Sequence, residues 1–190
     1  YPFGRWVPDY GTLFEVAPGI HWLRMPLPFG LDHINLWALD AGDGPNGGWA
    51  LVDTGVNMPR TRGYWETLFA GPLSCKPVTR VIVTHYHPDH LGLAGWLCER
   101  WNVPLEIART EYLLARTLTL DVRDKAPPEA VDFSIRAGWP KAAVAEMRDK
   151  PWGNFNKIVS PLPLGFKRIR DGDVLAIGAR QWRVVTGRGH

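Results

Sequence analysis

The feature that most constrains this chain is a group of histidine and aspartate residues placed directly after a hydrophobic strand. Residues 81–84 read Val-Ile-Val-Thr, a β-branched run typical of a buried strand. Residues 85–90 then contain three histidines and one aspartate, and residues 91–101 have the apolar spacing of a short helix. The group is therefore predicted to lie where a strand passes into a helix, which is where α/β sheets bind their ligands.

The spacing within this group suits metal binding. In an extended segment residues two apart point to the same side, so His85 and His87 can direct both imidazoles at one cation. Asp89 and His90 follow where the chain is expected to turn and can reach a second point nearby, while Pro88 restricts the backbone between the two pairs. Neutral imidazole and carboxylate are suitable ligands for zinc and similar metals. The alternative is a surface turn in which the histidines occur by coincidence. The low histidine content, 6 in 190 residues, argues against it.

Three motifs, in order along the chain, resemble the metallo-β-lactamase superfamily. Residues 85–90 match its His-x-His-x-Asp-His signature, and residues 51–55, Leu-Val-Asp-Thr-Gly, resemble its Asp-Thr-Gly strand end. Residues 185–190 resemble the strand that ends in its third histidine ligand, with Arg188 where the family usually has proline. The resemblance covers most of the chain and is weakest between residues 110 and 165.

The resemblance implies an α/β fold, the four-layer αββα sandwich, in a single domain over residues 1–190 that stops after the third histidine ligand. The family continues beyond this point with a bridging aspartate, a further histidine and the second half of the sandwich. It also implies two metal ions, zinc or alternatively iron or manganese. His85, His87 and His190 would bind the first ion, and Asp89 and His90 the second, which leaves the second ion with an incomplete set of ligands.

Two aspartates have predicted roles beside the ligands. Two metals can share a hydroxide that is a nucleophile at neutral pH. Asp89 is the candidate catalytic residue, because it can also orient this hydroxide or carry a proton. Asp53 is predicted to accept a hydrogen bond from a ligand histidine and so to orient it, the alternative being an ordinary strand end.

The loop over residues 26–32 is a candidate for substrate contact. In the resembled family a loop at this place overhangs the metal site, so Leu27 and Phe29 are candidates to touch substrate, with hairpin packing as the alternative. His33 follows the loop and is a candidate for the mouth of the site. His21 lies inside an expected strand and is predicted to be structural.

Strands and helices are expected to alternate, with a helical insert at about residues 110–165 that lies beside the metals and shapes the substrate pocket. Its first helix carries apolar residues at helical spacing, namely Leu113, Leu114, Leu118 and Val122. The expected strands are 12–17, 20–25, 34–39, 49–53, 78–84, 104–108, 166–170, 173–177 and 181–186. The expected helices are 59–69, 91–101, 110–122, 127–138 and 140–150, with 151–165 irregular.

Composition limits the partners and the compartment. No apolar run approaches the ~20 residues of a membrane span, and a net charge of +3 with scattered basic residues does not indicate nucleic acid. Cys75 and Cys98 lack zinc-ribbon or redox spacing and are predicted to be free thiols in a reducing cytoplasm. Residues 1–5 lack the apolar core of a secretion signal. They also lack an initiator methionine, and the alternative to a cytoplasmic protein is therefore one whose signal peptide was removed earlier.

These features predict a metal-dependent hydrolase with a small-molecule substrate. The helical insert and the 10 tryptophans favour the apolar acyl group of a thioester, ester or lactone over a polynucleotide. The alternatives are a phosphodiesterase or nuclease, a β-lactam hydrolase, and an inactive or metal-poor fragment. The missing export signal argues against the β-lactam hydrolase.

Overall fold

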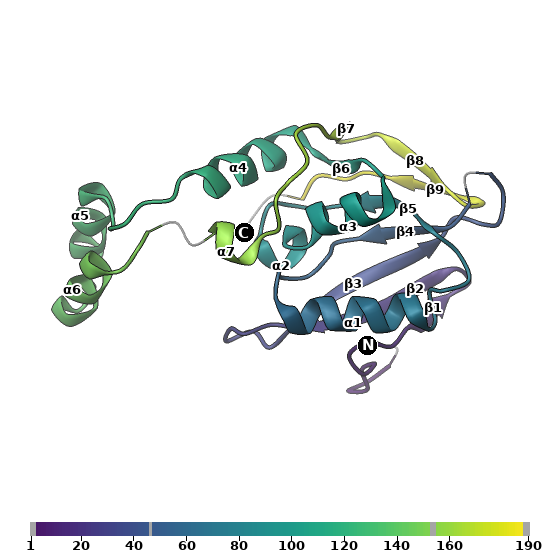
Figure 1. Ribbon diagram of the computed structural model, residues 1–190, viewed down its shortest axis with the longest axis horizontal. Helices are drawn as coiled ribbons and strands as arrows, with labels where there is room; N and C mark the ends of the chain where they lie inside the picture. Colours follow the sequence, from purple (N-terminus) through teal and green to yellow (C-terminus); the bar gives the residue numbers. More distant parts are fainter. Residues whose placement is uncertain (1–2, 46, 153–154, 188–190) are drawn as a thin grey trace.

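A seven-stranded mixed sheet forms the centre of the molecule (Figure 1). The computed structural model describes residues 3–45, 47–152 and 155–187. The strands lie in sequence order, β1 to β4 antiparallel and β4 to β7 parallel, so the carboxyl ends of β2 and β4–β7 share one edge. The strands are β1 Phe14–Ala17, β2 Ile20–Pro26, β3 His33–Asp40, β4 Trp49–Val52, β5 Val78–Ile82, β6 Leu105–Ala108 and β7 Lys167–Ile169.

Helices cover one face of this sheet. They are α1 (Pro59–Ala70), α3 (Ala94–Trp101) and α4 (Arg109–Leu120), which follow β4, β5 and β6 as crossover helices of a parallel sheet do. Trp65 of α1 and Leu97 of α3 are fully buried against apolar side chains from the sheet, including Leu51 and Val81. This apolar layer is the main core, and it fixes the positions of the strand ends.

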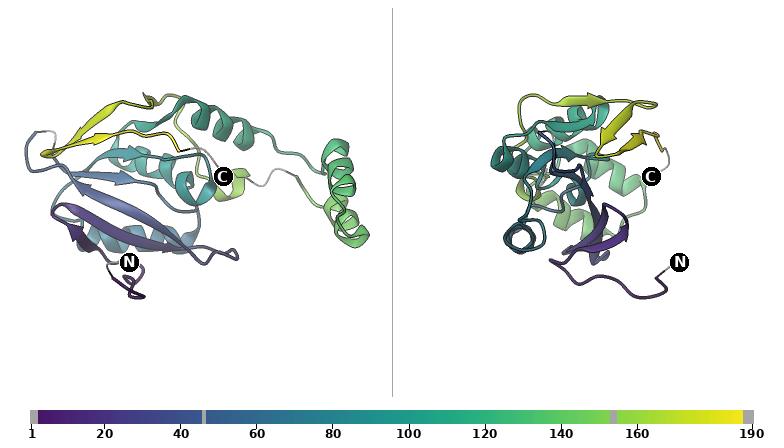
Figure 2. Two further views of the ribbon diagram at one scale, coloured as in Figure 1. Left: turned by 180° about the vertical axis from the view of Figure 1, so that it is seen from behind. Right: turned by 90° about the vertical axis from the view of Figure 1, so that its right-hand side faces the viewer.

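On the opposite face of the sheet lies a hairpin, β8 (Val174–Ile177) and β9 (Arg180–Arg183), which forms a separate two-stranded sheet (Figure 2). Ile177 packs into a smaller cluster with Leu39, Ala50 and Ile82. The arrangement of helices, large sheet and second sheet is the α/β layering expected from the sequence.

The helical insert separates β6 from β7. It consists of α4, α5 (Pro128–Arg136), α6 (Lys141–Asp149) and the short α7 (Phe155–Ile158). Figures 1 and 2 show α5 and α6 projecting away from the body as a helical hairpin. At its base the backbones of Arg123 and Trp152 exchange two hydrogen bonds, of 3.0 and 2.9 Å. Among the helices described, none has the length and hydrophobicity needed to span a membrane.

The structure corrects the expected helices in two places. The single helix expected over residues 91–101 is preceded by a separate one, α2 (Pro88–Leu91), which starts inside the ligand group. Residues 151–165, expected to be irregular, contain α7. Pro88 explains the first difference, because its fixed φ and missing N–H suit the first position of a helix.

Of the four apolar residues that predicted α4, Leu118 is half-buried and the other three are exposed. Leu113 and Val122 are 54% and 49% exposed, whereas Tyr112 and Ala115 are buried. The ring of Tyr112 stacks on Phe166, with centroids 4.1 Å apart, and its hydroxyl donates to two backbone carbonyls in the segment before β7. These contacts of Tyr112 set the rotation of the helix.

Candidate metal centre

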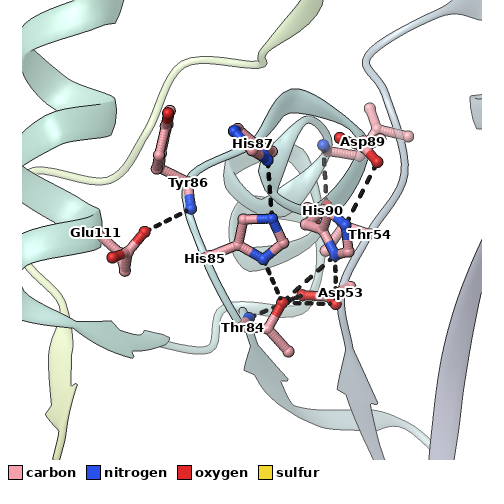
Figure 3. Close-up of polar contacts among 10 residues, drawn as sticks. Asp53, Thr54, Thr84, His85, Tyr86, His87, Asp89, His90 and Glu111 are labelled. Atoms are coloured by element: carbon pink, nitrogen blue, oxygen red, sulfur yellow. Dashed lines mark hydrogen bonds and ion pairs between the residues drawn. The ribbon is translucent and has the colours of Figure 1, made fainter. Parts of the chain in front are cut away.

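The ligand group lies at the edge of the sheet where the parallel strands end, between the ends of β4 and β6. The sequence predicted an extended segment here, but beyond β5 the chain bends at residues 84–86. The rings of His85 and His87 nevertheless face each other (Figure 3). His85 Nε2 and His87 Nδ1 are 3.0 Å apart. Two nitrogens on one tetrahedral zinc ion lie about 3.3 Å apart, given Zn–N bonds of about 2.05 Å. These two nitrogens could therefore hold one metal ion.

Asp89 and His90 form the second pair. The sequence suggested that they lie where the chain changes direction, but in the structure they belong to the short helix α2. His90 Nε2 is 3.4 Å from Asp89 Oδ2, and the rings of His90 and His85 are 4.0 Å apart between centroids. Burial raises the pKa of the Asp89 carboxyl, but its hydrogen bond to His90 and the charge of His90, with smaller contributions, together outweigh this and hold the pKa below its usual value. The pair offers one oxygen and one nitrogen ligand beside the first two nitrogens.

Asp53 holds His90 from the side away from Asp89. The residue is 4% exposed, and Oδ2 accepts a hydrogen bond of 2.7 Å from His90 Nδ1. Because the carboxylate can only accept, Nδ1 carries the proton and Nε2 is directed towards Asp89. Burial lowers the pKa of His90, but Asp53 and Asp89 raise it to about 9, so a metal ion at Nε2 competes with a proton.

The backbone of Asp53 has an unusual conformation, with φ of 62°. Positive φ is uncommon for a residue with a side chain, and such strain persists where surrounding contacts fix it. Here Oδ1 accepts from the backbone N–H of Thr84 at 2.8 Å, in addition to the bond to His90. The contact that an orienting role requires is therefore present.

Two residues of the site were not predicted from the sequence. Thr84 Oγ1 lies 2.9 and 3.0 Å from the carboxylate oxygens of Asp53 and 3.0 Å from His85 Nδ1. Glu111, in the first turn of α4, accepts a 3.0 Å hydrogen bond from the backbone N–H of Tyr86. Thr84 could have been inferred as a hydroxyl next to a ligand histidine, whereas no local pattern marks Glu111.

A cavity of about 570 Å³ opens beside His85 and His87, and its wall includes Glu111, Arg170 and residues 184–187. The last of these segments leads to His190, the predicted third ligand, which lies outside the described residues.

The predicted substrate loop follows β2 at the same edge of the sheet, but other segments line this cavity. Leu27 is 9% exposed and Phe29 is 50% exposed. His33 Nδ1 lies 2.5 Å from a carboxylate oxygen of Asp32. His21 sits in β2 with its ring edge-on to Trp49, in keeping with a structural role. Contact of the loop with substrate stays a prediction.

Residues 30–190 match the model of the metallo-β-lactamase superfamily. A solved β-lactamase domain protein from Burkholderia ambifaria is similar over 98% of this chain and 51% of its own, with 43% identity and a TM-score of 0.83. A metallo-β-lactamase family protein from Thermus thermophilus has 26% identity over 90% of this chain and 52% of its own, with a TM-score of 0.66. A subclass B3 metallo-β-lactamase of Bradyrhizobium japonicum, 17% identical over 100% of this chain and 56% of its own, shares the fold with a TM-score of 0.57.

No curated protein matches the chain. The chain spans about half the length of the solved structures it matches, 51% and 52% for the first two. The α/β sandwich expected from the sequence is confirmed as the fold.

Proposed function

Because the chain belongs to the metallo-β-lactamase superfamily, we propose that it is a metal-dependent hydrolase of a carboxylic thioester, ester or lactone. The observation that supports this most is the facing pair of ring nitrogens of His85 and His87, 3.0 Å apart, beside Asp89 and His90. When bound, two zinc ions, or iron or manganese, would supply Lewis acidity and lower the pKa of water from ~15.7 to about 7.

Each residue of the site has a part in this proposal. His85 and His87 would hold the first ion, and His190 is the proposed third ligand. Asp89 and His90 would hold the second ion, and the Asp89 carboxylate would also accept a proton from water. Asp53 keeps the Nδ1 proton of His90 in place at 2.7 Å, so that Nε2 remains a ligand.

The residues that line the cavity indicate which substrate groups could bind there. Arg170 lines it together with apolar atoms of Ala108, Ile169 and Val184. An acyl chain can pack on the apolar part while the guanidinium binds a negative group of the substrate. The same arginine also suits a phosphodiester, which is the second candidate substrate.

Hydrolysis of four reporter compounds tests the proposal. Purified natural full-length protein should cleave a thioester, ester or lactone faster than bis-(p-nitrophenyl) phosphate or a chromogenic β-lactam. Activity should be lost with a chelator and restored by zinc. Faster cleavage of the phosphodiester would favour the second candidate, and activity indifferent to chelation would refute both.

Two variants assign the residues. Asp89→Asn keeps the shape but loses a charged oxygen, so kcat should fall by about 100-fold or more, the range typical of a lost general base, with little change in melting temperature. Wild-type turnover would remove Asp89 from the mechanism. His85→Ala combined with His87→Ala should lower the metal content measured by elemental analysis, and an unchanged content would refute the assignment of these ligands.

A further inference from the structure

The segment that carries His85 and His87 leaves the sheet and bends at residues 84–86. The last ladder bond beside it is made by the backbone N–H of Val83, which donates to the carbonyl of Glu106 on β6 at 2.9 Å. Beyond Val83 the strand partners are no longer alongside, because β4 ends at Val52 and β6 ends at Ala108. Something other than neighbouring strands must therefore hold the next residues in place.

Two carboxylates take the place of the missing strands, one on each side. The N–H of Thr84 donates to Asp53 Oδ1 at 2.8 Å, and the N–H of Tyr86 donates to Glu111 Oε2 at 3.0 Å (Figure 3). Asp53 lies just after β4, and Glu111 lies just after β6, on α4. The two carboxylates thus anchor the bent segment on both sides beyond the end of β5.

The two anchored residues lie next to the predicted metal ligands in the sequence. Thr84 and Tyr86 use their backbone N–H groups, while the residues next to them, His85 and His87, present their rings to the site. If the bond at Tyr86 is lost, the peptide between the two histidines can rotate, and the two ring nitrogens need not stay 3.0 Å apart. A carboxylate acceptor makes this bond stronger than a neutral one would.

Glu111 is well placed to hold its charge at this point. It is the third residue of α4, whose N-terminal N–H groups favour a nearby negative charge. Ala108, which precedes the helix, provides no side-chain cap that would compete for these groups. The ring of Tyr86 also contacts the insert. It stacks with the ring of Phe155 on α7, with centroids 6.4 Å apart.

We propose that Glu111 is a positioning residue, which fixes the bent segment over residues 84–87 and through which the helical insert controls the geometry of the metal centre. This inference rests on the proposed function, since it takes His85 and His87 to be metal ligands. Asp53 was predicted from the sequence to orient a ligand. Glu111, which binds the same segment from the other side, was found from the structure alone.

Metal affinity and cobalt spectra of the natural full-length protein test the inference. Zinc affinity is measured by competition with a chelator, and the ligand geometry by the visible spectrum of the Co²⁺-substituted protein. Glu111→Ala should weaken zinc binding by at least about 10-fold, as loss of outer partners of metal ligands does, and should change the cobalt spectrum. Glu111→Gln should rescue both, because its amide oxygen still accepts from Tyr86.

Glu129→Ala is the matched control, because Glu129 is likewise in the first turn of a helix, on the projecting α5. It should behave as wild type. Unchanged affinity and spectrum in Glu111→Ala would overturn the inference and leave the proposed function intact, because the wild type would still bind metal. Failure of the wild type to bind zinc or cobalt would overturn both. If Glu111→Ala does not fold, Glu111→Asp decides, since its shorter carboxylate should also weaken binding and unchanged binding would refute the role.

Discussion

Replacing Arg80 with methionine should destabilise the protein strongly, because it leaves a buried carboxylate without its partner. Arg80 on β5 and Glu106 on β6 form a two-pronged ion pair, with Nε–Oε1 of 2.7 Å and Nη2–Oε2 of 2.6 Å. Glu106 is 1% exposed, and the Arg80 side chain is 16% exposed. Arg80 Nη1 also donates to the carbonyl of Ala176 at 3.0 Å and so ties the β8–β9 hairpin to the large sheet.

The size of the effect follows from the burial. Removing one partner of a buried ion pair costs about 3–5 kcal/mol. Lys167 Nζ lies 3.4 Å from Glu106 Oε2 and compensates part of the charge, although its side chain is 58% exposed. We therefore expect the lower end of the range, about 3 kcal/mol. With a urea slope of about 2 kcal/mol per molar, the unfolding midpoint should fall by about 1.5 M.

Urea unfolding followed by tryptophan fluorescence measures this midpoint. Arg80→Met with Glu106→Leu should be less destabilised than Arg80→Met alone, because the double variant buries no unpaired charge. Lys150→Met is a control, because Lys150 and Glu146 form an ion pair with both side chains 65% exposed, and its midpoint should not change. An Arg80→Met midpoint within about 0.3 M of wild type, at equal slope, would refute the reasoning.

Thiol labelling at about pH 8 should modify the exposed Cys75 and spare Cys98 in the native protein, because burial raises the pKa of Cys98 to about 12; equal modification rates by mass spectrometry would contradict this. Asp40→Asn should destabilise the protein at neutral pH but not in acid. Burial raises the pKa of Asp40, but its bond to Lys76, the bond from the backbone N–H of Gly42 and the charge of Lys76 together outweigh this, so the folded pKa lies below the usual value. The stabilisation is therefore present above the unfolded value of about 3.9 and is lost as pH falls through the folded pKa; a difference in urea midpoint that persists unchanged at about pH 2 would contradict it. Trp65→Phe should cost about 2 kcal/mol in the same urea assay, since Trp65 is 0% exposed and its N–H donates to a backbone carbonyl at 2.8 Å; a loss below about 0.5 kcal/mol would argue against it.

Local patterns predicted the parts of the fold that depend on neighbouring residues. The β-branched run before Thr84 became β5, and the proline at residue 59 began α1, as expected. The spacing of His85 and His87 predicted that their rings would lie together, and they do, although the chain between them bends rather than staying extended.

The remaining features depend on contacts between distant segments. Leu113 and Val122 gave α4 its helical spacing, but the contacts of Tyr112 with the segment before β7 decided which side is buried. Glu111 reaches the ligand segment across 25 positions of sequence, and only the pairing of β5 with β6 brings it there. Sequence alone cannot specify such partners, because no pattern near Glu111 refers to Tyr86.

The two backbone hydrogen bonds between Arg123 and Trp152 make the projecting helical hairpin a unit that can be replaced as a whole. The chain enters and leaves it at nearly the same place, so residues 124–151 can be exchanged for a short turn at little entropic cost of loop closure. Glu111 and Phe155 both lie on the body side of this junction. Libraries of replacement segments could therefore exchange the projecting hairpin while the bond between Glu111 and Tyr86 is left untouched.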